Sequence, residues 1–408
     1  MEEKLHGGIE QPSFREMDDA SLNSNDGKKL SDRFLLALQT QKGPNAVEYL
    51  LDRVPDTRAT KLIKTKEFIM MKGPDEDDKK ATKFTEFGAA RSIYTGPDLK
   101  ASTDRYQLTS YKNRLVVVVT DQGQPGLRSA EIAANNATTS LQENQGLIFD
   151  SRSAARELLQ AVNIAHDKIV DAYSLQHYGG RTSILVGELF EIEPDTVHPK
   201  KKREMFFLAV SVGNCKAFHW SHKYRTIKDF TRPELQNLNV GGIGPLVLRD
   251  CPDLSNIDCY YCDCVEDDLI FVFTNGIEAN FDPENLGLTP RDVPPILKSS
   301  DSFNNLPLKW SDMEPSACLS LKSSFASDLF NKIITSHQPD TPSSSTDKLE
   351  PELITPKSAV TRILDYCYKI TQPTRDYLDL YPNKKVPTNK SNYPGLLDQA
   401  TCICFTVE

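Results

Sequence analysis

Short apolar runs, which suggest strands, alternate along the chain with longer stretches in which apolar residues recur every three or four positions, which suggest helices. The run Leu115 to Val119 is too short for a helix, and its β-branched residues predict a strand buried on both faces. Further strands are predicted at 84–94, 182–190, 206–220, 269–274 and 401–407.

Helical spacing is clearest at 153–173, where Leu158, Val162, Ala165 and Ile169 share one face. Other helices are predicted at 31–40, at 45–54, from Ala130 onward and at 358–371. The strands come in runs instead of alternating singly with helices. This order favours an α+β fold, which we predict to be a four-layer α-β-β-α sandwich of two mainly antiparallel sheets flanked by helices.

Composition divides the chain into parts. Residues 1–83 are predicted to be a polar N-terminal region with two short helices, and residues 84–408 to be the main domain. A flexible insertion is predicted at about 299–351, because the tract 337–352 is rich in Pro, Ser and Thr and cannot bury a core.

Charge and hydropathy exclude two classes of partner. The net charge of -9 argues against nucleic acid, for which a basic footprint is expected. No window approaches the roughly 18 apolar residues that cross a bilayer, and the N-terminus has no apolar signal core. We therefore predict a cytoplasmic protein that binds neither nucleic acid nor membrane. The basic segment Lys200 to Arg203 leaves a nuclear location as an alternative to an exposed hairpin tip.

The nine cysteines include two clusters, Cys259-x-x-Cys262-x-Cys264 and Cys402-x-Cys404. No matched Cys/His pair follows the first cluster at the spacing of a zinc ribbon. Both clusters lie in strand-like runs, so buried free thiols in a reducing compartment are favoured over a metal or redox site.

Asp121 directly follows the strand 115–119 and stands in a turn with Gly123 and Gly126. A carboxylate at the end of a rigid strand, beside glycines that let carbonyl groups approach, suits a divalent cation. A plain strand–turn–helix corner with an Asp in the turn is the alternative.

A series of motifs in a fixed order resembles the metal-dependent, PPM-type (2C-class) serine/threonine protein phosphatases. The resemblance covers about 84–408. The matching pieces are Thr103-Asp104, Asp121 to Gly126, Gly179 to Ser183, Val212 to Lys216, Gly241 to Gly244, Thr274 to Gly276 and Asp398 to Thr401.

The resemblance implies hydrolysis of phosphoserine or phosphothreonine by a water that two Mg²⁺ or Mn²⁺ ions activate. Carboxylate and carbonyl oxygens would hold these ions. The implied metal ligands are Asp104, Asp121, the Gln122 carbonyl, Asn275 and Asp398, with Asn214 at the pocket edge and Lys100 as the phosphate-binding residue.

The chain departs from the family pattern at these positions. Asn275 and Asn214 replace two carboxylates, Thr103 replaces a Glu, and Lys100 stands where the family has an Arg. Loss of charge at the metal site predicts weak or absent Mg²⁺ or Mn²⁺ binding. We therefore predict a pseudophosphatase that binds a phosphoprotein or another protein partner. An active, atypical Mg²⁺/Mn²⁺-dependent phosphatase is the alternative.

Overall fold

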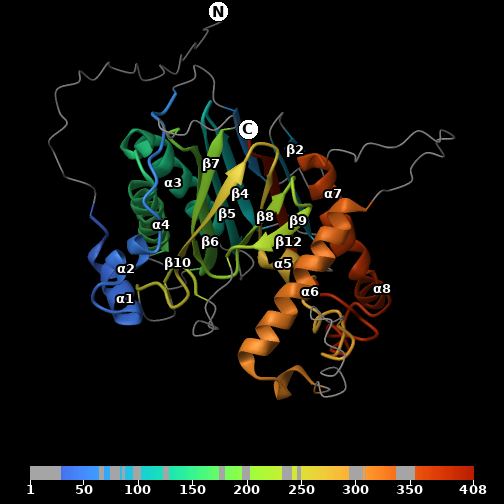
Figure 1. Ribbon diagram of the computed structural model, residues 1–408. Helices are drawn as coiled ribbons and strands as arrows, with labels where there is room; N and C mark the ends of the chain where they lie inside the picture. The colour runs from blue at the N-terminus through green and yellow to red at the C-terminus, as the bar shows by residue number, and fades with distance from the viewer. Residues whose placement is uncertain are drawn as a thin grey trace, which may run out of the picture.

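A computed structural model gives the structure of the chain (Figure 1). It describes residues 29–63, 69–73, 83–84, 88–94, 103–122, 128–173, 180–194, 203–231, 241–245, 250–293, 307, 309–336 and 354–408. Lys100, the turn 123–127, the basic residues 200–202 and the tract 337–352 lie outside these ranges.

The strands form two six-stranded sheets in which every pairing between the named strands is antiparallel. The first sheet has the order β1 (Ile69–Gly73), β4 (Arg105–Ser110), β5 (Arg114–Gln122), β6 (Thr182–Glu191), β7 (Glu204–Val212) and β10 (Asp258–Val265). The second has the order β2 (Lys83–Phe84), β3 (Gly88–Tyr94), β12 (Gln399–Thr406), β11 (Leu269–Phe273), β8 (Lys216–Ser221) and β9 (Thr226–Asp229).

The strand-like segment at 206–220 consists of two strands, β7 and β8, that belong to different sheets. The break falls at Gly213, whose φ of 100° lies in the left-handed region that favours glycine. An added Cβ at Gly213 would stand 2.2 Å from the Ser183 hydroxyl, so the turn also needs the missing side chain. The chain therefore crosses from one sheet to the other within a few residues.

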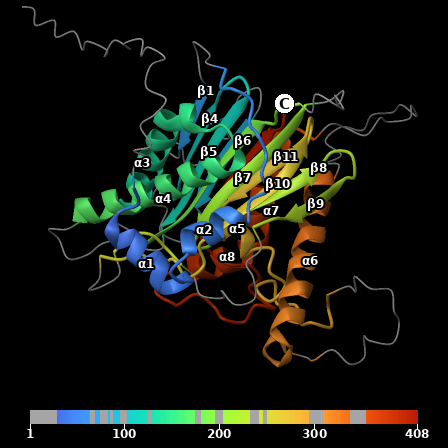
Figure 2. The same cartoon turned by 60° about the vertical axis from the view of Figure 1, so that its left-hand side comes forward.

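Helices cover the outer face of each sheet (Figures 1 and 2). The first sheet carries α3 (Ser129–Asn144) and α4 (Ser151–Tyr173), which are joined by a short 3-10 helix (Gln145–Leu147). Helices α1 (Asp32–Lys42) and α2 (Ala46–Asp52) pack nearby. The second sheet carries α5 (Asn275–Glu278), α6 (Pro315–Thr335), α7 (Pro356–Ile370) and α8 (Gln372–Leu380), with a 3-10 turn at Trp310–Asp312. The predicted four-layer α-β-β-α sandwich is confirmed.

The central part of strand β5, Leu115 to Val119, is apolar at every position. Val116 and Val118 face the helices of the first sheet, whereas Val117 and Val119 face the second sheet. All four are buried, because a central strand of a four-layer sandwich has a core on both sides. The inter-sheet core also contains Phe207, Phe405 and their neighbours.

The boundary predicted at residue 84, between the N-terminal region and the main domain, falls between β1 and β4 in the sequence. These two strands pair with each other, so β1 is part of the first sheet. Helices α1 and α2 occur where two short helices were predicted, and Phe34, Leu38 and Leu50 are buried in the core of the first sheet and its helices. Within the predicted insertion, residues 315–335 form α6, a helix that the Ser-rich composition did not suggest.

Two further features follow from the described residues. No helix in the described part of the chain is long and apolar enough to cross a membrane. All nine cysteines are free thiols, and Cys259, Cys264, Cys402 and Cys404 are buried. Burial raises the pKa of the Cys259 thiol to about 12, so this thiol is kept protonated and unreactive.

Candidate functional site

Asp104 stands just before β4 and is fully buried. Its Oδ2 accepts hydrogen bonds from the hydroxyl groups of Thr274, at 2.9 Å, and Thr401, at 3.0 Å. Its Oδ1 has no hydrogen-bond partner among the described groups. Because Thr274 follows β11 and Thr401 lies in β12, this carboxyl group of the first sheet is held by the second.

Asp121 lies near the end of β5, opposite Ser183 of β6. Its Oδ2 accepts a hydrogen bond of 3.2 Å from the backbone N–H of Asn275, the first residue of α5. Its own carbonyl accepts the Thr182 hydroxyl at 2.9 Å. The side chain at the end of β5 is therefore directed toward the start of α5.

The Asn275 side chain faces Asp398 and lowers the pKa of that carboxyl group. An amide can favour an ionised carboxyl group in this way only through its N–H groups. The Asp398 Oδ1 accepts a hydrogen bond of 2.8 Å from the Gln399 N–H. Asn275 thus presents N–H groups to two aspartates, its backbone N–H to Asp121 and its side-chain amide to Asp398.

Gln399 closes the site from the β12 side. Its Oε1 accepts hydrogen bonds from the Thr103 hydroxyl at 2.9 Å, from the Asp104 N–H at 3.1 Å, and from the Thr103 N–H. Gly276 packs so closely here that an added Cβ would stand 1.8 Å from the Gln399 carbonyl oxygen. The chain needs glycine at this position.

Burial raises the pKa of all three aspartates, and the charge of a neighbouring aspartate adds to the shift for Asp104 and Asp121. Burial and then the charge of Asp121 raise the pKa of Asp104 well above its usual range. Burial and then the charge of Asp398 raise the pKa of Asp121 to about 7. Burial also raises the pKa of Asp398, against the lowering effect of its bonds to Gln399 and Asn275.

The oxygens of the site bear on whether it can hold a divalent cation. The unpartnered Oδ1 of buried Asp104 is an oxygen that a cation could use. The donor set opposes a pair of ions, because Asn275 presents N–H groups, and no carboxylate, to Asp121 and Asp398. Among the described residues, no group of three or more His, Cys, Asp or Glu is arranged to hold a metal ion. The residues do not fit a two-metal centre, and the ligand roles of Asp104, Asp121, Gln122, Asn275 and Asp398 stay predictions.

The other predicted residues take separate places. Asn214 lies in the turn between β7 and β8, and its N–H donates to the Ser183 hydroxyl at 3.2 Å. Burial, and then the charges of Asp121 and Asp104, raise the pKa of the next residue, Cys215, so this turn lies beside the aspartates. The Gln122 backbone pairs with Thr182, and Lys100 lies outside the described residues.

Sequence reasoning missed Thr274, Thr401 and Gln399 as site residues. All three stand inside segments that were singled out, at 274–276 and 398–401. None of the three is a carboxylate or replaces one, so the metal-ligand pattern does not mark them. Hydroxyl and amide groups beside a buried carboxyl group were the available signal, since such a group needs donors.

A glycine-rich segment supports the edge of the site. The Ile243 N–H donates to the Thr182 carbonyl at 2.9 Å, next to Asp121 in the neighbouring strand. The Gly244 N–H donates to His166 Nδ1 at 3.1 Å, and His166 Nε2 lies 3.2 Å from the Asp250 carbonyl oxygen. Burial lowers the pKa of His166 to about 4, so its ring is neutral and can accept from Gly244.

Comparisons with known proteins give similarity of fold only. No family model matches the chain, and no curated protein does. Three similar solved structures are the catalytic domain of the serine/threonine protein phosphatase PstP in complex with two manganese ions, the S. agalactiae serine/threonine phosphatase, and the PP2C phosphatase domain of SpoIIE from Bacillus subtilis with a fragment of its regulatory domain.

These likenesses are distant but extend over most of the chain. For PstP the identity is 8%, the TM-score is 0.37, and the match covers 84% of this chain and 100% of the other. The S. agalactiae enzyme has 12% identity, a TM-score of 0.42, and coverage of 79% and 99%. SpoIIE has 9% identity, a TM-score of 0.34, and coverage of 84% and 65%. PP2C phosphatases are therefore among the structures that resemble this fold, and the function has to be inferred from the site itself.

Proposed function

We propose that this chain is a divergent PPM-type phosphatase-like domain in which catalysis is impaired and which acts by binding a protein partner, either a phosphoprotein or another protein. The observation that carries this proposal is the position of Asn275, a neutral residue that faces two of the aspartates. One residue supplies N–H groups to Asp121, at 3.2 Å, and to Asp398.

This arrangement opposes hydrolysis for a physical reason. A two-metal centre stabilises the attacking and leaving oxygens with cations that carboxylates hold in place. At position 275 the amide brings no charge, and its N–H group competes with a cation for the Asp398 oxygens. Even an altered group outside the ligand shell typically costs about 10–100-fold in metal affinity or activity, so a lost ligand charge should cost at least that much.

The second candidate is an active, atypical Mg²⁺/Mn²⁺-dependent protein phosphatase. It is favoured by the unpartnered Asp104 Oδ1 and by the crowding of three aspartates, which a cation would relieve. Bound there, a divalent cation would supply an activated water, and Asp104, Asp121 and Asp398 would be the residues to hold it. A cytoplasmic location, or a nuclear one, remains part of the proposal.

Two measurements separate the candidates: calorimetric titration with Mn²⁺ and release of phosphate from a phosphopeptide. We expect the unmodified chain to bind Mn²⁺ weakly and to release phosphate very slowly in millimolar Mn²⁺. The double variant Asn275→Asp, Asn214→Asp should bind Mn²⁺ at least tenfold more tightly, because each change restores a charge beside the aspartates. Asp121→Ala should abolish the binding that remains.

Asn45→Asp is the matched control, since Asn45 is exposed at the start of α2 and far from the site in sequence. Its Mn²⁺ affinity should equal that of the unmodified chain. Rapid Mn²⁺-dependent turnover by the unmodified chain would overturn the first candidate and establish the second. A double variant that binds Mn²⁺ no better than the unmodified chain would contradict the assigned role of Asn275.

A further inference from the structure

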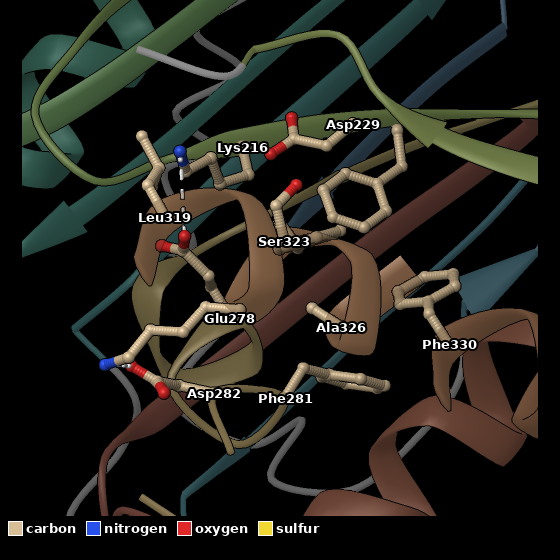
Figure 3. Close-up of a pocket in the computed structure, with 12 residues that line it drawn as sticks. Lys216, Asp229, Glu278, Phe281, Asp282, Leu319, Ser323, Ala326 and Phe330 are labelled. Atoms are coloured by element: carbon tan, nitrogen blue, oxygen red, sulfur yellow. Dashed lines mark hydrogen bonds and ion pairs between the residues drawn. The ribbon is translucent and has the colours of Figure 1, made fainter. Parts of the chain in front are cut away.

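A cavity lies between α6 and the outer face of the second sheet, beside α5 (Figure 3). Its volume is about 160 Å³. An engineered protein cavity of roughly 150 Å³ is known to admit benzene, so this space can hold a single small ring or a chain of similar size. None of Asp104, Asp121 and Asp398 lines it.

The floor of the cavity is aromatic. Phe218 and Phe273 come from strands β8 and β11, Phe281 follows α5, and Phe330 comes from α6. The Phe330 ring centroid lies 5.2 Å from that of Phe218, 5.8 Å from Phe273 and 5.1 Å from Phe281. Rings locked together in this way form a rigid apolar surface that a flat, apolar ligand can contact.

The rim of the cavity is charged, with an excess of negative groups. Figure 3 shows Lys216 directed at Glu278, and their charged atoms are 3.6 Å apart. Lys322 pairs with Asp282 at 3.1 Å and also with Glu284, which lies just outside the lining. Both lysines are therefore already occupied by carboxylates.

Asp229 is the remaining charged group of the lining. Its Oδ1 accepts from the N–H and the hydroxyl of Thr231, both at 2.9 Å. The described part of the chain places no cationic group within ion-pair distance of Asp229. With two lysines against the four carboxylates named, the rim attracts a cation.

We propose that this cavity binds a small organic ammonium ion, with an apolar or aromatic body of about six to ten non-hydrogen atoms lying on the phenylalanines and its ammonium group at Asp229. The four phenylalanine rings supply the apolar contact. The net negative rim selects the cation over a neutral or anionic molecule of the same size. A cation above a phenylalanine face gains a further small attraction.

Benzylamine tests the proposal, because it carries an ammonium group at neutral pH and has the same number of non-hydrogen atoms as neutral benzyl alcohol. Binding to the full chain would be measured by ligand-observed NMR at pH 7. We expect benzylamine to bind about tenfold more tightly than benzyl alcohol, and benzoate to bind more weakly than either. Raised salt should reduce the advantage of benzylamine.

Two variants locate the site. Asp229→Asn should remove most of the preference for benzylamine over benzyl alcohol, whereas the same change at exposed Asp328 on α6 should leave it unaltered. Ala326→Leu places a larger side chain in the cavity and should weaken both ligands. Equal binding of benzylamine and benzyl alcohol, no binding of either, or a preference that survives in Asp229→Asn would each overturn the proposal.

Discussion

Thr274, Asn275 and Gly276 have three different tasks within one turn of the chain. Thr274 donates its hydroxyl to buried Asp104, Asn275 donates to Asp121 and Asp398, and Gly276 leaves room for the Gln399 carbonyl oxygen. Each residue type follows from its surroundings: a donor for a buried carboxyl group, a neutral donor between two carboxylates, and no side chain at a close backbone contact. Of these three residues, only Asn275 bears on the proposed loss of metal-dependent catalysis.

Gly276 gives a first test. Gly276→Ala should destabilise the protein by several kcal/mol, because its Cβ would stand 1.8 Å from a backbone oxygen that cannot move aside cheaply. Gly146→Ala is the control, since an added Cβ at Gly146 meets nothing within 4 Å. Urea unfolding would compare the two variants. Equal free energies of unfolding would show that the backbone at Gly276 can shift.

Asp121 gives a test that depends on pH. Its pKa is about 7 in the folded chain and 3.8 ordinarily, so between these values the folded protein keeps a proton that the unfolded chain releases. The contribution to stability is therefore present at low pH and lost as pH rises through about 7. With a chelator present, Asp121→Asn should gain about 2 kcal/mol over the unmodified chain between pH 5 and pH 8, a value reduced for partial exposure.

The control for this pH dependence is Asp328→Asn, at an exposed position of α6. Its stability relative to the unmodified chain should stay constant from pH 5 to pH 8. A stabilisation by Asp121→Asn that does not grow with pH would mean that Asp121 is ionised throughout the range.

At the scale of elements, α6 differs from what the sequence suggested. Five serines in its 21 residues hide its helical periodicity, and only Phe330 and Ile334 are buried. Glu314 caps its first turn by accepting from the Ala317 N–H at 2.9 Å, and Pro315 stands where its missing N–H costs nothing. The helix is therefore specified by its N-terminus and by one aromatic contact more than by a repeated apolar face.

Phe330→Ala measures that contact. The Phe330 ring packs on four other phenylalanine rings with centroids 5.1–5.8 Å away, so its loss should destabilise the protein by about 3–5 kcal/mol. Phe325→Ala, at a half-buried position of the same helix, should cost markedly less. Thermal and urea unfolding would report both. A small effect of Phe330→Ala would indicate that α6 unfolds separately from the rest of the molecule.

At the scale of the whole molecule, strand runs and the amphipathic α4 were sufficient to predict the layers. The order of strands was not predictable, because antiparallel pairing depends on partners distant in sequence, such as β12 with β3. The crossing from one sheet to the other at Gly213 was not predictable, because residues on both sides of it, such as Ala209 and Ala217, belong to the same core between the sheets. The order of the motifs predicted that Asp104, Asp121, Asn275 and Asp398 lie in one pocket. Their hydrogen bonds were not predictable, because these depend on side-chain directions that cannot be read from the sequence.

The position of Asp104 has a mechanical consequence. It is anchored in the first sheet, and its Oδ2 accepts hydroxyl groups from Thr274 and Thr401 of the second. Between the sheets most other contacts are apolar and tolerate sliding, whereas two directional bonds to one buried oxygen resist shear. The aspartate cluster thus links the two sheets at one end of the sandwich. A change in the charge of that cluster, by protonation or by cation binding, therefore also changes how rigidly the two sheets are joined.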